Sequence, residues 1–188
     1  MNGLMMDIPL TVTSIMRHAE RFSGKTEIVS VCKDNPRHKY TYEEAFRRVR
    51  CLANVFEGWK LTQGDRIATL AWNDHRHLET YYATSCAGFV CHTINPRLFP
   101  EQIIYIINHA ADSYVFLDPD FYGLIESIAD QCQNVKGWVV MTNSELMPKT
   151  NINNVFCYET LIEENSDEFC WPELNENSAC ALCYTSGT

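Results

Sequence analysis

The chain has 188 residues, of which 46% are hydrophobic and 21% are charged. This composition is typical of one folded globular domain and excludes a disordered protein. A formal net charge of −9 disfavours nucleic acid and anionic membranes as partners. A small polyanion could still bind where backbone amides and a few cations converge.

The N-terminus does not have the pattern of a signal peptide. Asp7 precedes the first basic residue, Arg17, and Pro9 interrupts the apolar residues of the segment. No uncharged apolar run approaches the roughly 20 residues that span a bilayer. We therefore expect no transmembrane segment and a cytoplasmic protein.

Nine cysteines are scattered through segments that otherwise read as protein core. Reduced, buried thiols are the simplest interpretation. Cys180 and Cys183 form a C-x-x-C motif, but strand residues three apart point to opposite faces of a sheet. We therefore assign this motif no metal or redox role.

A first helix is predicted to begin after Thr41. Thr41 and Glu44 form a capping box, in which a hydroxyl and a carboxylate bind the first free amides. Apolar residues then recur at helical spacing to about Glu57, with Gly58 beyond the end of the helix. A small β element is expected before this helix, from Glu27 to Tyr40. Three arginines of the helix are interpreted as a solvated face: Arg47, Arg48 and Arg50.

After this helix, short apolar runs alternate with amphipathic segments. The runs begin near Arg66, Phe89, Ser113 and Gly137, and their starts lie 23 or 24 residues apart. This distance fits one strand plus one crossover helix, so it predicts a parallel sheet with right-handed connections. The fold class is therefore α/β, with a parallel sheet and flanking helices.

The crossover helix after the first strand is expected to be capped by Asn73 or Asp74. The face that we expect it to bury consists of Leu78, Tyr81, Tyr82 and Ser85.

The chain changes character between residues 142 and 177, where it becomes polar and acidic. We interpret this stretch as a loose connection within the domain, with one short helix near Tyr158 to Glu163. A further buried strand is expected from Ser178 to Tyr184. Thr185 then begins a loop at the carboxyl end of that strand, the edge at which open α/β sheets bind ligands.

The sequence lacks the motifs of several kinds of functional site. No G-x-G-x-x-G follows a predicted strand, which disfavours a nucleotide-dependent oxidoreductase. No G-x-S-x-G is present, which disfavours a hydrolase. His75 and His77 lie two apart on a helix and so face different directions, which disfavours metal ligation by this pair. We assign no catalytic residue and no metal ligand, and we give no catalysis to the remaining histidines: His18, His38, His92 and His109.

The last five residues, Tyr184 to Thr188, read Y-T-S-G-T. Glycine permits positive φ, small side chains allow close approach, and successive amides and hydroxyls can hold anionic oxygens. These are the requirements of a phosphate-binding loop. A plain polar turn has the same composition and is the competing interpretation.

The order of several motifs points to one family. The sequence contains Q-G-D-R-I-A-T-L-A-W-N, then R-H-L-E, then H-T-I-N-P-R-L-F-P-E-Q-I-I-Y-I-I-N-H-A-A-D, and finally Y-T-S-G-T. From about Pro9 to Thr188, it resembles the N-terminal part of a fatty-acyl-CoA synthetase of the adenylate-forming, AMP-binding superfamily. The stretch from His92 to Asp112 is especially similar to long-chain and medium-chain fatty-acid CoA ligases.

The resemblance implies a function for the last residues. In this family Y-T-S-G-T opens a loop that continues to a lysine and wraps the β- and γ-phosphates of ATP. The residues that match this motif are Thr185, Ser186, Gly187 and Thr188. The family activates a carboxylic acid with Mg-ATP as acyl-adenylate, and CoA then forms the thioester. The implied cofactors are ATP, Mg²⁺ and CoA.

The resemblance also implies that residues 1–188 are a partial N-terminal AMP-binding domain that stops inside the ATP loop. We expect such a fragment to be inactive alone, because the remaining contacts would follow residue 188. Asn95, Pro96 and Arg97 match a family turn, for which we prefer a structural role. Some relatives dimerise through their N-terminal region, so a homodimer is also implied. The alternative to an enzyme is a non-catalytic α/β binding or assembly module.

Overall fold

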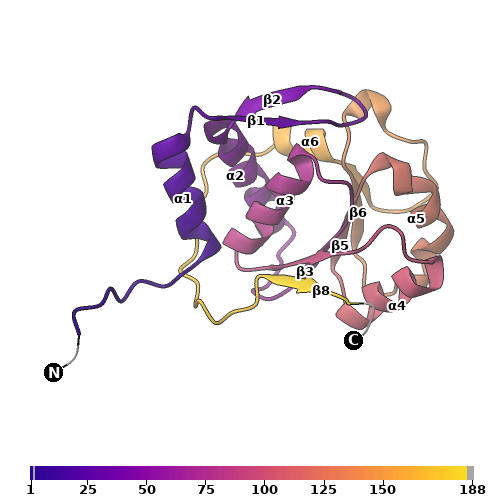
Figure 1. Cartoon of the computed structure of the whole chain (residues 1–188). Coiled ribbons are helices and arrows are strands. Elements are labelled where there is room, and N and C mark those ends of the chain that lie inside the picture. Colours follow the sequence, from indigo (N-terminus) through magenta and orange to yellow (C-terminus); the bar gives the residue numbers. More distant parts are fainter. Residues whose placement is uncertain (2, 186–188) are drawn as a thin grey trace.

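A computed structural model describes residue 1 and residues 3–185. Its main feature is a six-stranded sheet in the order β7-β6-β5-β3-β4-β8, in which every neighbouring pair is parallel (Figure 1). The strands are β3 (Arg66–Leu70), β4 (Val90–Thr93), β5 (Tyr114–Leu117), β6 (Gly137–Val140), β7 (Val155–Cys157) and β8 (Ala181–Cys183). The predicted parallel α/β fold is confirmed, and the four predicted strand starts are each correct to within one residue.

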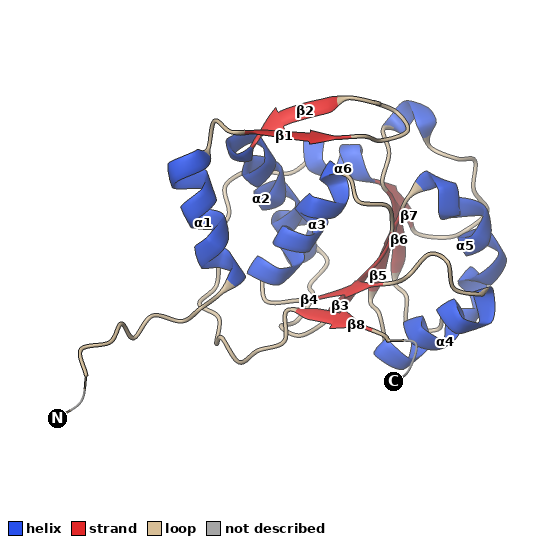
Figure 2. Cartoon of the chain, in the orientation of Figure 1, coloured by secondary structure: helices blue, strands red, loops and turns tan. Residues whose placement is uncertain are grey.

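Helices cover both faces of this sheet (Figure 2). They are α1 (Val12–Ser23), α2 (Tyr42–Gly58), α3 (His75–Cys86), α4 (Pro100–Ala110), α5 (Tyr122–Ile128) and α6 (Tyr158–Glu163). One core packs α1, α2, α3 and α6 on the face that carries Ile67 and Phe116. The other packs α4 and α5 on the face that carries Ala68 and Val115. Neighbouring strand residues thus point to opposite cores, as the pleat of a strand requires.

The small β element expected from Glu27 to Tyr40 is present and forms an antiparallel hairpin outside this sheet. It pairs β1 (Glu27–Ser30) with β2 (His38–Thr41) and crosses the ends of α2 and α3 (Figure 1). The capping box is also confirmed, since the Thr41 side chain accepts from Glu44 N and the Glu44 carboxylate accepts from Thr41 N. The predicted end of α2 is wrong by one residue, because Gly58 is its last helical residue. The left-handed residue after it is Lys60, with φ 55°.

Two elements were missed by the sequence interpretation. Helix α1 begins after Thr11, whose hydroxyl accepts from Ser14 N, and it buries Met16. Strand β7 joins the sheet within the polar stretch 142–177, where only the short helix α6 was expected. The helix itself is confirmed, at Tyr158–Glu163.

The expectation of a buried last strand is wrong. In β8, Ala181 and Cys183 are exposed and only Leu182 is half-buried. The physical reason is position: among the described residues β8 pairs only with β4, so it is an edge strand.

Gly137, at the start of β6, is a position where a side chain has no room. A Cβ there would lie 2.8 Å from Phe156, 2.9 Å from Tyr114 and 3.2 Å from the Asn154 carbonyl oxygen. We expect Gly137→Ala to lower the free energy of unfolding by about 1–3 kcal/mol, the usual cost of overpacking a core. Urea unfolding measures this change.

Gly123 provides the matched control, because it lies in α5 and a Cβ added there would meet no atom of the described residues within 4 Å. Gly123→Ala should stabilise the protein by roughly 0.5–1 kcal/mol through helix propensity. Equal effects of the two substitutions would contradict the packing described for β6.

Candidate active site

The predicted phosphate-binding loop starts at the carboxyl edge of the sheet. Strand β8 runs parallel to β4, so Tyr184 and Thr185 follow it on the same edge as the turn that begins at Asn95. Thr185 is exposed and lines a cavity of about 640 Å³. Of the predicted site residues, Ser186, Gly187 and Thr188 lie outside the described residues. The other side chains around the cavity are Thr93, Asn95, Leu98, Glu101, Gln102, Tyr105, Ile106 and Tyr184.

Tyr184 fixes the start of the loop against α4. Its hydroxyl lies 2.6 Å from Nδ1 of His109. Its ring packs 5.2 Å from the ring of His92, measured between centroids. Tyr184, which precedes Thr185, is therefore held by His109 of α4 and His92 of β4.

His92 and Asp112 form a buried pair beneath Tyr184. Nδ1 of His92 lies 2.8 Å from Oδ2 and 3.0 Å from Oδ1 of Asp112, and both side chains are 0% exposed. Burial raises the pKa of Asp112, although the contact with His92 opposes this shift. Nε2 of His92 has no hydrogen-bond partner among the described residues. The pair ties β4 to the segment after α4 and supports the strand that leads into the loop.

Two further hollows lie along the same edge. One, of about 420 Å³, separates the hairpin from α3 and is mainly apolar, with Ile28, Val29, Leu78 and Tyr81 in its wall. It shares Thr93 with the cavity beside Thr185. The other, of about 290 Å³, contains charged side chains, and its wall includes Cys32, Lys33, Asp34, Asp74, Arg76 and Asp118.

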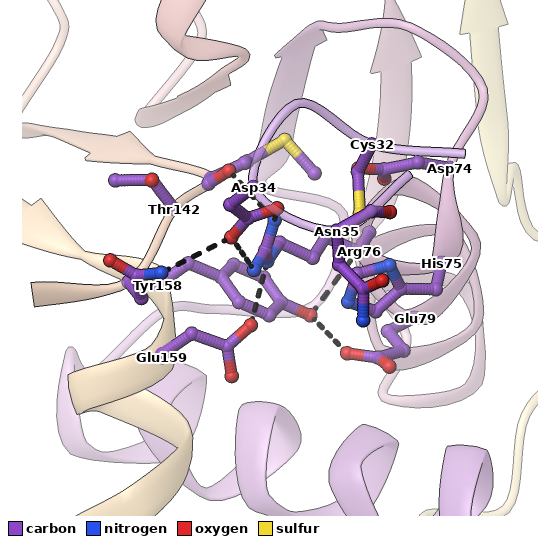
Figure 3. A network of polar contacts seen from close by, with 12 residues as sticks. Cys32, Asp34, Asn35, Asp74, His75, Arg76, Glu79, Thr142, Tyr158 and Glu159 are labelled. Atoms are coloured by element: carbon purple, nitrogen blue, oxygen red, sulfur yellow. Dashed lines mark hydrogen bonds and ion pairs between the residues drawn. The ribbon is translucent and has the colours of Figure 1, made fainter. Parts of the chain in front are cut away.

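Arg76, at the start of α3, is the centre of a polar network (Figure 3). Its Nη2 lies 2.6 Å from Oδ2 of Asp34, and its Nε lies 2.6 Å from Oε1 of Glu159. Nη1 donates to the carbonyl of Met141 at 3.3 Å. The guanidinium thereby joins the loop of the hairpin, the end of β6 and helix α6 to α3.

Glu79 lies one turn further along α3 and is 0% exposed. Its carboxylate accepts from Nε of Arg48 at 2.9 Å and from the hydroxyl of Tyr158 at 2.8 Å. Arg48 also contacts Glu159 with both terminal nitrogens, at 2.9 and 3.2 Å. Buried charges persist in a protein only when they are paired in this way.

This network corrects two sequence expectations. Helix α3 buries a largely polar face. Of the residues predicted on its buried face, Ser85 is buried, whereas Leu78, Tyr81 and Tyr82 are only half-buried. The arginines of α2 are not a common solvated face either: Arg47 is exposed, but Arg48 is paired with Glu79 and Arg50 with Glu20. In both cases the partners come from distant elements, which local periodicity cannot show.

The predicted divergence of His75 and His77 is confirmed. Nδ1 of His75 lies 3.3 Å from the Ser30 hydroxyl, whereas Nε2 of His77 lies 3.0 Å from the Thr69 hydroxyl. Burial, together with the charge of Arg76, lowers the pKa of His75 to about 2. All nine cysteines are free thiols, but the expectation that they are buried is correct for only four of them: Cys51, Cys86, Cys91 and Cys132. Cys170 and Cys183 are exposed.

Glu159 makes the stability of the protein dependent on pH. Burial alone would raise the pKa of its carboxyl, but Arg48 and Arg76 outweigh burial and lower it. A carboxyl whose folded pKa lies below its unfolded pKa stabilises the fold above the unfolded value, near 4.5. This contribution is lost as the pH falls through the folded pKa.

We therefore expect the wild type to lose stability faster than Glu159→Gln when the pH falls from about 5 to 3. The difference in slope should approach about 1.4 kcal/mol per pH unit for one proton. Urea unfolding at several pH values measures both curves. Parallel curves for the two proteins would contradict the ion pairing of Glu159.

Comparison with known proteins identifies the family. The model of the AMP-binding enzyme family matches residues 15–188. The chain belongs to the AMP-binding enzyme family. The resemblance seen in the sequence motifs is thereby confirmed, and residues 184–188 of this AMP-binding chain lie inside the matched range.

Three curated relatives of this AMP-binding chain are CoA ligases. A 3-methylmercaptopropionyl-CoA ligase of Ruegeria lacuscaerulensis is 47% identical over all of this chain and 35% of the relative. A medium-chain-fatty-acid–CoA ligase of Ectopseudomonas oleovorans is 45% identical over all of this chain and 34% of the relative. A long-chain-fatty-acid–CoA ligase of Thermus thermophilus is 37% identical over 98% of this chain and 32% of the relative. The chain spans about a third of the length of these relatives.

Solved structures show the same fold. The anthranilate CoA ligase AuaEII superposes with a TM-score of 0.85 at 16% identity, covering 97% of this chain and 33% of that protein. A fatty acyl CoA synthetase of Mycobacterium tuberculosis superposes with a TM-score of 0.75 at 19% identity, covering 94% of this chain and 32% of that protein. Within residue 1 and residues 3–185, no helix has both the length and the apolarity to cross a membrane.

Proposed function

We propose that the protein to which this chain belongs activates a fatty or related carboxylic acid with ATP and transfers the acyl group to CoA. The observation that carries the proposal is the family match through residues 184–188, combined with the position of Thr185. Thr185 follows a parallel strand at its carboxyl end and faces a cavity of about 640 Å³. This is the edge at which α/β sheets bind nucleotides.

The chemistry follows from the poor electrophilicity of a carboxylate. Its oxygen attacks the α-phosphorus of ATP, a P–O bond forms, and the bond to pyrophosphate breaks. The thiol of CoA then attacks the acyl carbon, AMP leaves, and the thiol proton passes to solvent. Mg²⁺ would neutralise part of the polyphosphate charge in the first step.

Within this chain, we assign the Thr185 hydroxyl and amide to the β- and γ-phosphates, together with Ser186, Gly187 and Thr188. Oriented amides and hydroxyls hold anionic oxygens best where they are fixed before the ligand arrives. The contacts of Tyr184 with His109 and His92 support such fixing at the start of the loop.

A chimaera tests the proposed reaction. We would join residues 1–188 to the part of the Ectopseudomonas oleovorans relative that follows the matched region. The chimaera would then be incubated with ATP, Mg²⁺, hydroxylamine and a series of straight-chain carboxylic acids. Trapping of acyl hydroxamate with at least one acid is expected. A chimaera that melts cooperatively but traps none of the acids would contradict the proposal.

We also propose a cytoplasmic location and a homodimer formed through the N-terminal region. Nine free thiols fit a reducing compartment.

The dimer is supported by large apolar side chains that are exposed before α1: Leu4, Met5, Met6, Ile8 and Leu10. Light scattering of the chain with and without residues 1–10 measures the effect. A monomer in both cases would contradict the dimer.

A further inference from the structure

Three side chains that the proposed reaction does not use lie between two hollows: Cys32 and Asp74 line the charged cavity near Arg76, and His75 lines the apolar hollow beside it. Cys32, Asp74 and His75 each offer one ligand atom, and these three atoms lie within 4.8 Å of one another. Cys32 belongs to the loop between β1 and β2, whereas Asp74 and His75 form the start of α3 (Figure 3). Two separate elements thus bring sulfur, oxygen and nitrogen donors together.

We propose that Cys32, Asp74 and His75 form a binding site for a divalent transition metal ion of the zinc class. Zn²⁺ binds thiolate, imidazole and carboxylate ligands, usually in a tetrahedral arrangement. A set that includes one sulfur and one nitrogen favours such an ion over Mg²⁺ or Ca²⁺, which prefer oxygen ligands. Three protein ligands would leave a fourth position for water from the cavity of about 290 Å³.

The charges around this cavity favour a cation. Asp74 and Asp118 both line it, and no lysine or arginine nitrogen of the described residues lies within 4.0 Å of either carboxylate. Each carboxylate accepts one backbone hydrogen bond, from His77 N at 3.0 Å and from Asp120 N at 3.1 Å.

The two cations in the wall are already paired with other carboxylates. Nζ of Lys33 lies 2.6 Å from Asp120, and Nη2 of Arg76 lies 2.6 Å from Asp34. The half-buried carboxylates of Asp74 and Asp118 are thereby left without a positive partner among the described residues. A bound dication would supply one.

The geometry requires only a small adjustment. Bonds of about 2.0–2.3 Å to a tetrahedral ion place its ligands roughly 3.5 Å apart. Because the three donor atoms lie within 4.8 Å of one another, they would move inward by at most about 1 Å. The ring of His75 is already oriented, since it stacks on His38 at 3.7 Å and contacts the Ser30 hydroxyl at 3.3 Å. Cys32 lies in the hairpin loop, where its thiol donates to the Asn35 carbonyl at 3.1 Å. On binding, that thiol would release its proton to solvent and exchange the hydrogen bond for a metal–sulfur bond.

Cobalt(II) provides the test, because it reports both geometry and sulfur ligation. We would strip the 188-residue chain with a chelator, remove the chelator and titrate with Co²⁺. Intense visible d–d bands and a thiolate-to-cobalt charge-transfer band in the near ultraviolet are expected, with saturation at one equivalent. Zn²⁺ should abolish both bands stoichiometrically, whereas excess Mg²⁺ should not.

Variants assign the ligands. Cys32→Ser should remove the charge-transfer band, whereas Cys170→Ser, at an exposed cysteine, should leave it intact. Asp74→Asn, which keeps a side-chain acceptor for the helix cap, should weaken Co²⁺ binding at least about tenfold, since even indirect contacts to a metal are worth that much. Retention of the band in Cys32→Ser, or weak octahedral spectra in the wild type, would overturn the proposal.

A second readout does not depend on variants. Zn²⁺ should slow alkylation of Cys32 by iodoacetamide, measured by peptide mass spectrometry, and leave the rate at Cys170 unchanged. Equal rates at Cys32 with and without Zn²⁺ would also overturn the proposal.

Discussion

Replacing Arg48 by methionine is expected to lower the free energy of unfolding by about 3–5 kcal/mol, the usual cost of leaving a buried charge without its partner. Arg48 is the only arginine or lysine of the described residues that contacts Glu79, which is 0% exposed. The substitution leaves Tyr158 as the one remaining side-chain donor to that carboxylate within the described part of the chain, at 2.8 Å. Methionine keeps the length and apolar contacts of the side chain, so the change isolates the charge.

The pH dependence of this variant gives a second signature. Burial raises the pKa of Glu79, while Arg48 and the Tyr158 hydroxyl oppose that shift. Without Arg48 the folded pKa rises further, so the folded state takes up a proton. A carboxyl with a raised folded pKa destabilises the fold as the pH rises through that value. The penalty of Arg48→Met should therefore be smaller at pH 5 than at pH 8.

Arg47→Met on the same helix is the matched control, because Arg47 is exposed. It should change stability by no more than about 0.5 kcal/mol. Urea unfolding of the three proteins measures both effects. A loss below about 1 kcal/mol for Arg48→Met, or a loss equal to that of Arg47→Met, would contradict a buried Arg48–Glu79 pair.

The second large effect concerns the phosphate loop. In the active chimaera, Thr185→Val should lower kcat/KM for ATP about 10- to 100-fold, because a hydrogen bond to a charged group contributes about 1.5–3 kcal/mol. Valine is nearly isosteric with threonine and removes only the hydroxyl. The KM for the carboxylic acid should change little, since Thr185 is assigned to phosphate.

Thr62→Val is the control for this substitution. Thr62 is exposed and precedes β3, so it lies at the amino end of the strands, opposite the loop. It should leave kcat/KM for ATP unchanged. Equal kinetics for Thr185→Val and the wild type, with equal melting temperatures, would remove Thr185 from the site.

Most of the sheet could be predicted from the sequence, because its strands are short apolar runs separated by crossover helices of regular length. Strands β3 and β6 begin at the predicted residues, and β4 and β5 begin one residue later. Strand β7 was not predicted from the sequence, for a physical reason. It has three half-buried residues and, within the described part of the chain, pairs only with β6, so it lacks the apolar run that identifies a central strand.

The polar core could not be predicted from local patterns. Arg48 and Glu79 are 31 residues apart, and Arg76 and Glu159 are 83 residues apart. Each of these side chains is typical of a solvated surface when it is read alone. Only the folded chain brings opposite charges together, and for this reason Glu79 is buried while Tyr81 is not.

The phosphate-loop assignment depends on a different kind of information. The four small residues Thr185 to Thr188 also have the composition of an ordinary turn, and resemblance to a family favoured the phosphate-binding interpretation. The structure adds what the motif could not show, namely the cavity beside Thr185 and the two histidines that contact Tyr184. The buried pair of His92 and Asp112 had no signal in the sequence, since its members are 20 residues apart.

ATP–pyrophosphate exchange tests the central claim most directly, because it reports adenylate formation without the CoA step. The assay would compare the 188-residue chain alone with the chimaera, each with labelled pyrophosphate, Mg-ATP and the acids that yield hydroxamate. We predict carboxylate-dependent exchange by the chimaera and none by the chain alone, which spans about a third of the length of its relatives. Exchange by the chain alone would contradict the predicted inactivity of residues 1–188, and a folded chimaera that shows no exchange with any acid would contradict acid activation itself.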